Sequence, residues 1–423
     1  MLPIQLFRQN KELVIEGLKK KNFKELELVD EIISIDERRR QLQVENDNLA
    51  ASINSASKSI GQLMAKGEKD EAEKMKADVA KHKEQTKELA QKLAELEQQQ
   101  EDLIIRLPNL PHSSVPVGKT PEENEVVRTG GKRPNLDAQK LPHWELTEKY
   151  NLINFELGTK LTGSGFPVYI GQGAKLQRSL ISYFLNYNIE AGYNEYYPPY
   201  MVNETSARGT GQLPDKEGQM YHATEDNFYL IPTAEVPVTN IYRDEIIKEA
   251  DLPVKMTAYT PCFRREAGSY GKDVRGLNRL HQFDKVEIVQ ITNPEKSYDA
   301  LEGMVAHVEK LLQNLDLEYR ILRLCGGDMS FTSALTYDFE VYSAAQERWL
   351  EVSSVSNFES FQTNRMKIRY KDGNGKTQLA HSLNGSSLAL PRIVACLLEN
   401  HQTPDGIKIP AALQPYFGKE MIN

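Results

Sequence analysis

A dense group of arginines between residues 261 and 287 carries the clearest chemistry in the sequence. The run reads PCFRREAGSYGKDVRGLNRLHQFDKVE, in which strand-like ends flank a loop rich in glycine and arginine. Its arginines are Arg264, Arg265, Arg275 and Arg279. Because the planar fork of an arginine matches the oxygens of a phosphate group, the run predicts either a phosphate-binding site or a surface hairpin with solvated arginines.

Several other nucleotide and hydrolase sites are excluded because their minimum residues are absent. The sequence has no G-x-x-x-x-G-K-[ST] phosphate loop, and the glycine pairs at 163–165 and 209–211 lack the third glycine of a dinucleotide-binding turn. The H-E-x-x-H, C-x-x-C and G-x-S-x-G motifs are absent as well, which argues against metal and serine hydrolases.

The arginine-rich run resembles the second signature of class II aminoacyl-tRNA synthetases, whose Phe-Arg-x-Glu core reads Phe263-Arg264-Arg265-Glu266 here. The closer resemblance is to bacterial seryl-tRNA synthetases, whose CFR-x-EAGS…RGL…R-x-HQF-x-KVE pattern is present nearly letter for letter. Further segments agree with that family in order: GYNEYYPPYMV (192–202), LIPTAEVPV (230–238), EVSSVSNFESFQTNR (351–365) and HSLNGSSLALPR (381–392). The resemblance covers essentially all of the chain.

This resemblance implies a serine–tRNA ligase, which makes seryl-adenylate from L-serine and ATP and then esterifies serine onto tRNA. Arg264 matches the family arginine that holds the α-phosphate and the serine carboxylate together, so it is the expected catalytic residue by positioning and charge stabilisation. Glu266 matches the residue that reads the adenine amino group, and Phe283 matches the ring that stacks on adenine. Arg279 and Arg392 match arginines that bind the triphosphate, Arg392 at its γ-phosphate.

The resemblance also implies a magnesium site. Glu351 and Ser354 match the family's metal-binding pair, and hard oxygen ligands together with phosphate oxygens suit Mg²⁺. The whole stretch Glu351, Val352, Ser353 and Ser354 matches an ATP-binding segment, and Arg265 is included in the ATP site as part of the contiguous signature without a side-chain role. Without the family, Glu351 is typical of an ordinary surface acid on a strand.

The implied serine pocket draws on several segments. Its expected residues are Thr233, Ala234, Glu235, Arg264, Glu287, Asn384 and Ser386. A carboxylate that faces the substrate ammonium is expected because a buried cation needs a partner. A pocket that hydrogen-bonds the serine hydroxyl rejects alanine, whereas rejection of threonine depends on tight space. Taken alone, Thr233 and Glu235 are more typical of strand and turn residues.

The sequence departs from the family pattern at neighbours of these residues. The family commonly has glycine where this chain has Ser387 and Pro391, and cysteine where it has Val355. These positions adjoin the matched contacts, so they bear on the loop geometry near Arg392.

Residues 24–106 contain no proline and follow a heptad of apolar residues. The first half of the repeat comprises Ile35, Leu42, Leu49, Ala56 and Leu63. The repeat restarts at Ala72 after Gly67, which predicts an antiparallel coiled-coil hairpin with helices about 55 Å long. We expect it to form an N-terminal tRNA-binding arm, with the domain boundary after Pro108.

Polar residues interrupt the predicted seam. They are Arg39, Asn46, His82, Thr86 and Gln100. They indicate control of register, although a ligand contact by His82 stays open. The arm is acidic as a whole, whereas lysines gather near its tip, so Lys58, Lys66 and Lys69 are either tRNA contacts or part of a solvated face.

Residues 109–423 alternate short strand-like runs with helical ones and are expected to form the catalytic domain. The predicted strands cover 166–170, 228–231, 285–291, 319–324, 336–343, 348–356 and 366–371. The predicted helices cover 141–156, 173–191, 294–316 and 387–401. Because many strands are joined by connections too short for a crossover helix, the fold class is α+β, with a mainly antiparallel sheet flanked by helices.

The composition restricts where the protein works. The 423 residues are 39% apolar and 26% charged with a net charge of −8, so nucleic-acid binding must use local basic patches. No apolar run is long enough to cross a membrane, and the start lacks a signal-peptide pattern. The three cysteines, Cys262, Cys325 and Cys396, form no disulfide or zinc pattern, which favours a reducing cytoplasm.

The resemblance implies a homodimer, because segment 192–202 resembles the strand that helps to form the family's dimer. It implies serine tRNA as the acceptor, read by shape, and leaves selenocysteine tRNA open as a second acceptor. The loop 269–276 is expected to approach the acceptor end of the tRNA.

Two alternative functions are an enzyme that loads a small amino acid onto a carrier protein and a non-enzymatic coiled-coil adaptor. The first is disfavoured by the long arm and the second by intact Arg264, Arg392 and Glu351.

Overall fold

The computed structural model of the chain describes residues 1–136, 140–215, 217–266 and 275–423. Contacts divide the chain into two compact units, Met1–Pro108 and Asn109–Asn423. Within the described ranges, no helix combines the length and apolar character that crossing a bilayer requires.

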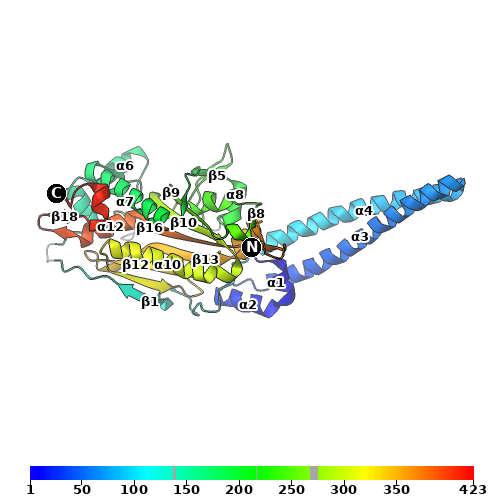
Figure 1. The fold of residues 1–423 in the computed structure, drawn as a ribbon, viewed down its shortest axis with the longest axis horizontal. Helices are drawn as coiled ribbons and strands as arrows, with labels where there is room; N and C mark the ends of the chain where they lie inside the picture. The colour runs from blue at the N-terminus through cyan, green and yellow to red at the C-terminus, as the bar shows by residue number, and fades with distance from the viewer. Residues whose placement is uncertain (137–139, 216, 267–274) are drawn as a thin grey trace. The chain divides into compact units, whose positions relative to one another are not determined.

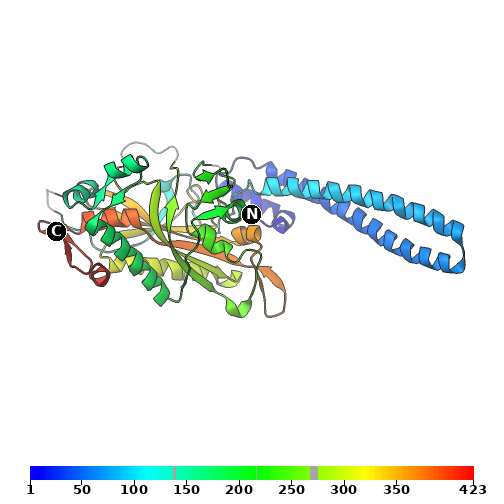
Figure 2. The ribbon, with the colours of Figure 1, turned by 90° about the horizontal axis from the view of Figure 1, so that it is seen from above.

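The first unit is built around two long helices, α3 (Leu28–Lys66) and α4 (Lys69–Ile104), which run side by side (Figures 1 and 2). Two short helices, α1 (Ile4–Gln9) and α2 (Lys11–Lys20), precede them. Gly67 ends α3 in the left-handed conformation, with φ of 83°, which glycine adopts without steric cost. The predicted seam residues are all buried or half-buried between the helices, so the coiled-coil hairpin is confirmed.

The polar seam residues Arg39 and Gln100 face a buried carboxylate that the heptad analysis overlooked. Asp36 is 1% exposed and accepts hydrogen bonds from Arg8 Nε at 2.6 Å and from Gln100 Nε2 at 3.3 Å. Arg40 Nε donates to it at 3.1 Å, and Arg39 lies 3.6 Å away. Burial opposes ionisation of Asp36, but the hydrogen bonds from Arg8 and Gln100 outweigh it and lower its pKa to about 2.

Replacing Asp36 with asparagine is expected to lower the free energy of unfolding of the first unit by about 2 kcal/mol, the value of a pKa depressed from 3.8 to about 2. Because the folded pKa lies below the unfolded one, this stability is complete above pH 3.8 and is lost as the pH falls toward 2. Chemical denaturation followed by helical circular dichroism measures it. Asp47→Asn, on the exposed face of the same helix, is the control, and equal stability of the two variants would contradict the prediction.

The second unit is built on an eight-stranded sheet with the order β1-β11-β12-β13-β16-β10-β9-β4. The strands are β1 (Glu125–Gly130), β11 (Tyr319–Arg323), β12 (Leu335–Ser343), β13 (Arg348–Glu359), β16 (His381–Ala389), β10 (Gln282–Thr292), β9 (Val254–Phe263) and β4 (Asn194–Glu195). Every neighbouring pair is antiparallel except β4 and β9. The predicted mainly antiparallel sheet is therefore confirmed.

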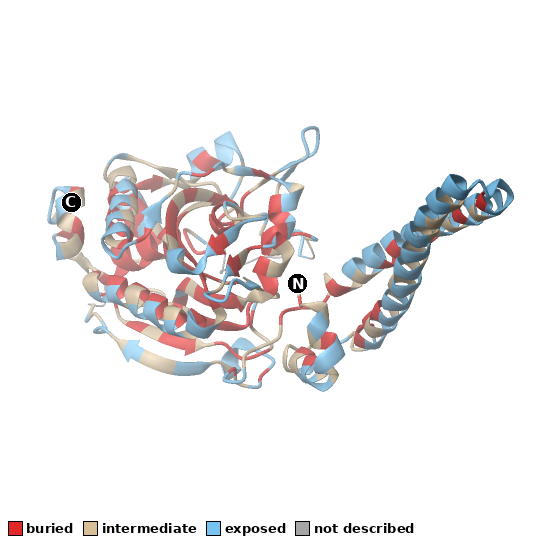
Figure 3. Cartoon of the chain, turned by 45° about the vertical axis from the view of Figure 1, so that its right-hand side comes forward, coloured by how far each residue is buried: buried red, intermediate tan, exposed pale blue. Residues whose placement is uncertain are grey.

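Among the described residues, the longest helices of the second unit pack on the sheet: α7 (Gly171–Glu190), α10 (Ser297–Asn314) and α12 (Leu390–Asn400) (Figure 1). On β10, Val286 and Ile288 belong to the core that these helices form with the sheet, whereas Lys285 and Glu287 alternate with them. Since successive strand residues point to opposite faces, Lys285 and Glu287 project from the other face. Figure 3 shows buried residues concentrated along the sheet and the helices packed on it.

Smaller elements surround this sheet. The further strands are β2 (Ile153–Asn154), β3 (Val168–Tyr169), β5 (Met201–Asn203), β6 (His222–Ala223), β7 (Phe228–Leu230), β8 (Ile246–Lys248), β14 (Arg369–Lys371), β15 (Thr377–Leu379), β17 (Gln402–Thr403), β18 (Gly406–Lys408) and β19 (Met421–Ile422). The further helices are α5 (His143–Lys149), α6 (Phe155–Leu161), α8 (Glu204–Thr210), α9 (Glu235–Asn240), α11 (Ser360–Met366) and α13 (Gln414–Phe417).

Two helix predictions need correction. The helix expected over 141–156 is split into α5 and α6, because Asn151 adopts a φ of 49° and Asn154 caps α6 by accepting from Leu157 N at 2.8 Å. The helix expected from 387 begins only at Leu390, after β16, with Pro391 in its first turn.

Strands were also missed or misplaced in the prediction. No strand range was predicted for β16, and only the end of β9 before Arg264 was predicted as strand-like, although both strands lie inside the sheet. The strand expected over 366–371 is shorter, because Met366 ends α11 and only Arg369–Lys371 pairs as β14.

Candidate active site

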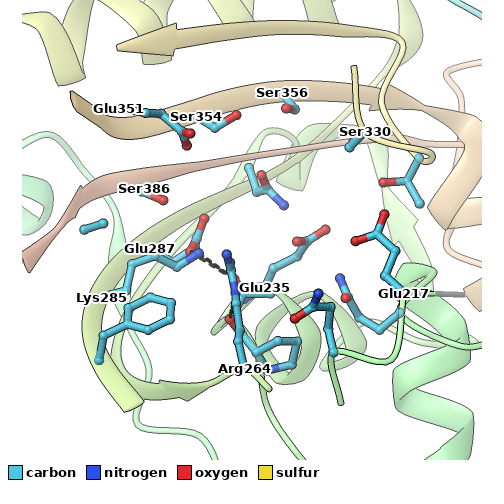
Figure 4. Close-up of a pocket in the computed structure, with 18 of the residues that line it drawn as sticks. Glu217, Glu235, Arg264, Lys285, Glu287, Ser330, Glu351, Ser354, Ser356 and Ser386 are labelled. Carbon is cyan, nitrogen blue, oxygen red and sulfur yellow. Dashed lines mark hydrogen bonds and ion pairs between the residues drawn. The ribbon is translucent and has the colours of Figure 1, made fainter. Parts of the chain in front are cut away.

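A cavity of about 660 Å³ lies over the part of the sheet formed by β10, β13 and β16 (Figure 4). Its lining includes Lys285 and Glu287 from β10, Glu351 and Ser354 from β13, and Asn384 from β16. Residues of segments 211–215, 217–220 and 232–235, before β9, and of 264–266 and 277–280, after it, also line the cavity, so residues far apart in the sequence meet here. The volume is ample for a nucleotide together with a small amino acid.

A buried ion pair lies at one end of the cavity. Lys285 Nζ is 2.5 Å from Glu287 Oε2 and donates to Thr233 Oγ1 at 2.9 Å, and Thr233 Oγ1 donates to Glu287 Oε2 at 3.1 Å. The side chains of Lys285 and Glu287 are only 8% and 3% exposed. Sequence reasoning assigned Thr233 and Glu287 but missed Lys285, although its period-2 spacing between Phe283 and Glu287 places it on the same face.

A second buried carboxylate, Glu235, lies beside this pair (Figure 4). Burial first, and then the neighbouring Glu287, raise its pKa to about 7, against the opposing hydrogen bond from Gln362. Among the described residues, no lysine or arginine forms an ion pair with Glu235. The lysine beside it, Lys285, forms its ion pair with Glu287. This end of the cavity is therefore complementary to a small ligand that brings its own ammonium group.

Arg264 follows directly after β9, and both its backbone and its side chain form hydrogen bonds. Its backbone N–H donates to His281 O at 2.9 Å, and its Nε donates to Pro232 O at 3.3 Å. Its guanidinium carbon lies 5.2 Å from the centre of the Phe283 ring. The guanidinium therefore lies between the carboxylate end of the cavity and the flat face of an aromatic ring.

Glu266 and Arg279 form an ion pair at 3.0 Å across the base of the loop that joins β9 to β10. Glu266 adopts a φ of 48°, a left-handed conformation that is uncommon for a residue with a side chain. With Phe283, these side chains line the same part of the cavity wall, which has the aromatic and polar groups that a nucleobase requires.

A β-bulge places Glu351 and Ser354 on the same side of the sheet. Along β13, Ser353 pairs with Phe339 but Glu351 pairs with Glu340, so Val352 is an extra residue in the ladder. The bulge shifts the alternation by one, which brings both oxygen-bearing side chains to the cavity, side by side in Figure 4. Arg392 Nη1 lies 3.5 Å from the Glu351 carboxylate and donates to Glu351 O at 2.7 Å.

The carboxylate of Asp338 on β12 lies behind this pair. Burial raises its pKa well above the ordinary value, and the charge of Glu351 raises it further, against a hydrogen bond from Ser354. Glu351 and Ser354 thus present hard oxygen donors at the cavity wall, which is the donor chemistry that Mg²⁺ prefers.

The structure gathers most of the predicted site residues in one cavity. Those that line it are Thr233, Glu235, Arg264, Glu266, Arg279, Phe283, Glu287, Glu351, Val352, Ser353, Ser354, Asn384, Ser386 and Arg392. Ala234 does not line it, because its side chain packs in a core cluster with Val238 and Met256. Arg265 points elsewhere, toward the Tyr221 ring, 5.8 Å from its centre. Of the predicted loop 269–276, residues 269–274 lie outside the described residues.

A buried network anchors the far side of that loop. His143 Nδ1 lies 2.7 Å from Glu399 Oε1, and His143 Nε2 accepts from Leu277 N at 2.9 Å. Glu399 also accepts from Gln346 Nε2, whose own oxygen accepts from Asn278 Nδ2. Sequence reasoning gave no indication of this network, because its members lie on segments far apart in the chain.

The departures from the family pattern are accommodated beside the cavity. Ser387 is fully buried and its Oγ donates to Asn188 Oδ1 at 2.9 Å. Its neighbour Leu388 adopts a φ of 72°, where β16 carries an irregularity in its pairing with β10. Pro391 lies in the first turn of α12, where a proline is compatible with a helix.

Comparison with known proteins supports what the geometry indicates. The family model of the tRNA synthetase class II core domain (G, H, P, S and T) matches residues 219–401, and that of the seryl-tRNA synthetase N-terminal domain matches residues 1–111. Serine–tRNA ligase of Salinibacter ruber is 52% identical over 99% of this chain and 98% of its own length. That of Methylacidiphilum infernorum is 49% identical over 100% of both.

Solved structures agree with these matches. The crystal structure of seryl-tRNA synthetase from Pyrococcus horikoshii complexed with ATP has a TM-score of 0.93 at 33% identity, covering 100% of this chain and 99% of that one. Cytoplasmic serine–tRNA ligase from Naegleria fowleri in complex with AMP has a TM-score of 0.88 at 26% identity, with the same coverage.

The antiparallel sheet, the cavity on its face and the core-domain match define a class II aminoacyl-tRNA synthetase. The N-terminal hairpin and the full-length relatives narrow this class further. The chain belongs to the seryl-tRNA synthetase family and has the serine–tRNA ligase activity of that family.

Proposed function

We propose that the cavity binds L-serine at its Glu235–Glu287 end and ATP along Arg264, Phe283 and Arg392. The observation that carries the proposal is that one guanidinium, Arg264, lies in the same cavity as the carboxylate end and the aromatic wall. Within the family's chemistry, a serine carboxylate oxygen bonds to the α-phosphorus of ATP while the bond to pyrophosphate breaks. Arg264 is suited to hold both reactants and to stabilise the charge that develops.

The remaining residues take roles consistent with their positions. Glu266 and Phe283 bind adenine, Arg279 and Arg392 bind the triphosphate, and the Glu266–Arg279 pair separates when ATP enters. Glu351 and Ser354 would hold Mg²⁺, and a bound Mg²⁺ would supply charge neutralisation at the phosphates. In the second step, a ribose hydroxyl at the 3′ end of the tRNA attacks the seryl carbonyl carbon and AMP leaves.

Selection of serine follows from the polar pocket wall. The buried oxygens of Thr233, Glu287 and Ser386 favour a ligand with a hydroxyl group, because alanine would form fewer hydrogen bonds with this polar wall. Threonine adds a methyl group, so its rejection depends on space alone.

The wider proposals concern partners. We propose that the hairpin of α3 and α4 binds serine tRNA through Lys58, Lys66 and Lys69, all of which are exposed, and that the enzyme works in the cytoplasm as a homodimer. The dimer proposal is supported by the position of β4 at a sheet edge and by Tyr197, which is 77% exposed just after it. Sedimentation equilibrium tests the dimer, and charging of purified selenocysteine tRNA tests that second acceptor.

Amino-acid-dependent ATP–pyrophosphate exchange, run with each of the twenty amino acids, tests the serine pocket. We expect exchange with serine, exchange near background with alanine and glycine, and loss of exchange when EDTA removes the divalent metal. Exchange with alanine or glycine in place of serine would favour the carrier-protein alternative. No exchange with any amino acid, from folded protein with Mg²⁺, would favour the adaptor.

A further inference from the structure

Gln362 on α11 forms a hydrogen bond with a carboxylate of the proposed serine pocket, although Gln362 itself does not line the cavity. Its side chain is 1% exposed and is not part of the cavity wall, yet its Nε2 donates to Glu235 Oε1 at 2.5 Å. The same Nε2 donates to Thr210 O at 3.2 Å, and its Oε1 accepts from Ser382 Oγ at 2.8 Å. One buried amide therefore links the end of α8, the start of β16 and a cavity carboxylate.

These contacts determine the orientation of the amide. The carbonyl of Thr210 has lone pairs only, so the group that faces it must be the NH₂ of Gln362. The hydroxyl of Ser382 donates to the other end and keeps the oxygen there. α11 is itself held next to this site, because Thr363 Oγ1 donates to Ala380 O. Both N–H bonds of Gln362 are thus committed, and one of them is aimed at Glu235.

A donor aimed at a carboxylate favours its anionic form. Several charged groups share the cavity wall with Glu235. They are Lys285 and Glu287 on β10, Arg264 and Glu266 after β9, Arg279 before β10, Asp215 and Glu217 after α8, Glu351 on β13, Arg365 on α11 and Arg392 on α12. Glu287 and burial both disfavour a second negative charge, and Lys285 is already paired with Glu287. Gln362, together with Asn384 on the cavity wall, is thus a neutral donor that offsets this penalty, whereas a cation in its place would compete with the substrate ammonium for Glu235.

We propose that Gln362 is a positioning residue for substrate ammonium recognition, which keeps the Glu235 carboxylate charged and directed into the serine end of the cavity. This inference rests on the proposed function, in which Glu235 faces the ammonium group of serine. It predicts that the affinity for serine depends on pH through Glu235 and that this dependence is set from outside the cavity.

The test is the pH dependence of kcat/KM for serine in ATP–pyrophosphate exchange with Gln362→Leu, which removes the donor at similar volume. We expect the KM for serine to rise roughly 10-fold at pH 7, with the KM for ATP unchanged, and the acidic limb of the profile to move up by about one pH unit. Raising the pH to about 9 is expected to restore most of the loss, because Glu235 then ionises without help. Gln362→Glu, which sets a carboxylate against a carboxylate, is expected to lose more, on the order of 100-fold.

The matched control is Gln177→Leu. Gln177 is also a buried glutamine, 6% exposed, and its Nε2 donates to a carboxylate, Asp284, at 2.9 Å, but neither residue lines the cavity. If Gln362→Leu fails to fold, Ser382→Ala releases the amide while leaving Gln362 in place, and it is expected to shift the acidic limb in the same direction by a smaller amount.

The outcomes separate this inference from the proposed function. If the unmodified enzyme activates no serine, the proposed function fails. If it activates serine but the Gln362 and Ser382 variants keep its pH profile and its KM for serine, the positioning role is wrong. A loss that affects ATP and serine equally and does not recover at high pH would also overturn it, because a purely structural defect has that form.

Discussion

Arg264→Ala is expected to reduce serine-dependent ATP–pyrophosphate exchange by about 10³-fold, because it removes the one guanidinium proposed to contact both reactants. The side chain is anchored to Pro232 O and lies against the Phe283 ring, so its position is set before substrate binds. Pre-organised charge in a protein cavity stabilises a developing phosphate charge far more than the same charge does in water. The measurement is the initial exchange rate with saturating ATP and serine.

Two further variants sharpen this test. Arg264→Lys retains the charge but not the fork, so it is expected to recover only a small part of the activity. Arg178→Ala, an exposed arginine on α7 outside the cavity wall, is the control and should exchange normally. Retention of more than about a tenth of the activity by Arg264→Ala would contradict its assignment as the electrostatic centre.

Reversing the charges of Lys58, Lys66 and Lys69 to glutamate is expected to weaken charging of serine tRNA on the order of 100-fold while leaving exchange intact. Each phosphate contact that is lost lowers the salt dependence of binding by about one unit, so the slope of log affinity against log salt should fall by roughly 3. Exchange should survive because the three exposed lysines belong to the first compact unit, whereas the cavity lies in the second.

The control for this triple variant carries the same change in net charge. Lys310, Lys408 and Lys419 are exposed lysines of the second unit, and their reversal is expected to have a much smaller effect on charging. Equal losses of exchange and charging in the arm variant would contradict the proposed division of labour. So would equal losses in charging for the two triple variants.

The hairpin and the arginine-rich run were predictable because their information is local. A heptad repeat specifies its own partner face, so the seam residues of α3 and α4 could be assigned before any contact was known. Period-2 spacing likewise placed Glu287 on a strand. The same spacing predicts that Lys285, two residues earlier, lies on the same face of that strand. Most of the predicted serine and ATP residues line one cavity, because many of them come from neighbouring strands of the same sheet.

The prediction was less accurate where one residue changes the course of the chain. Asn151 with its positive φ and the cap at Asn154 split one expected helix into two, and Pro391 delayed another. In each case the apolar pattern continued across the break. Periodicity alone could not locate the break, because backbone conformation at a single residue overrides the pattern of its neighbours.

By itself, the sequence determined the class of protein, the coiled-coil hairpin and the phosphate-binding character of the run around Arg264. Only the tertiary structure decided how the site works in detail. The bulge at Val352 turns Glu351 and Ser354 to one side, and Gln362 reaches Glu235 across 127 positions of the chain. Such contacts depend on strand register and on how α8, α11 and the sheet pack together, and no local pattern in the sequence encodes these distances.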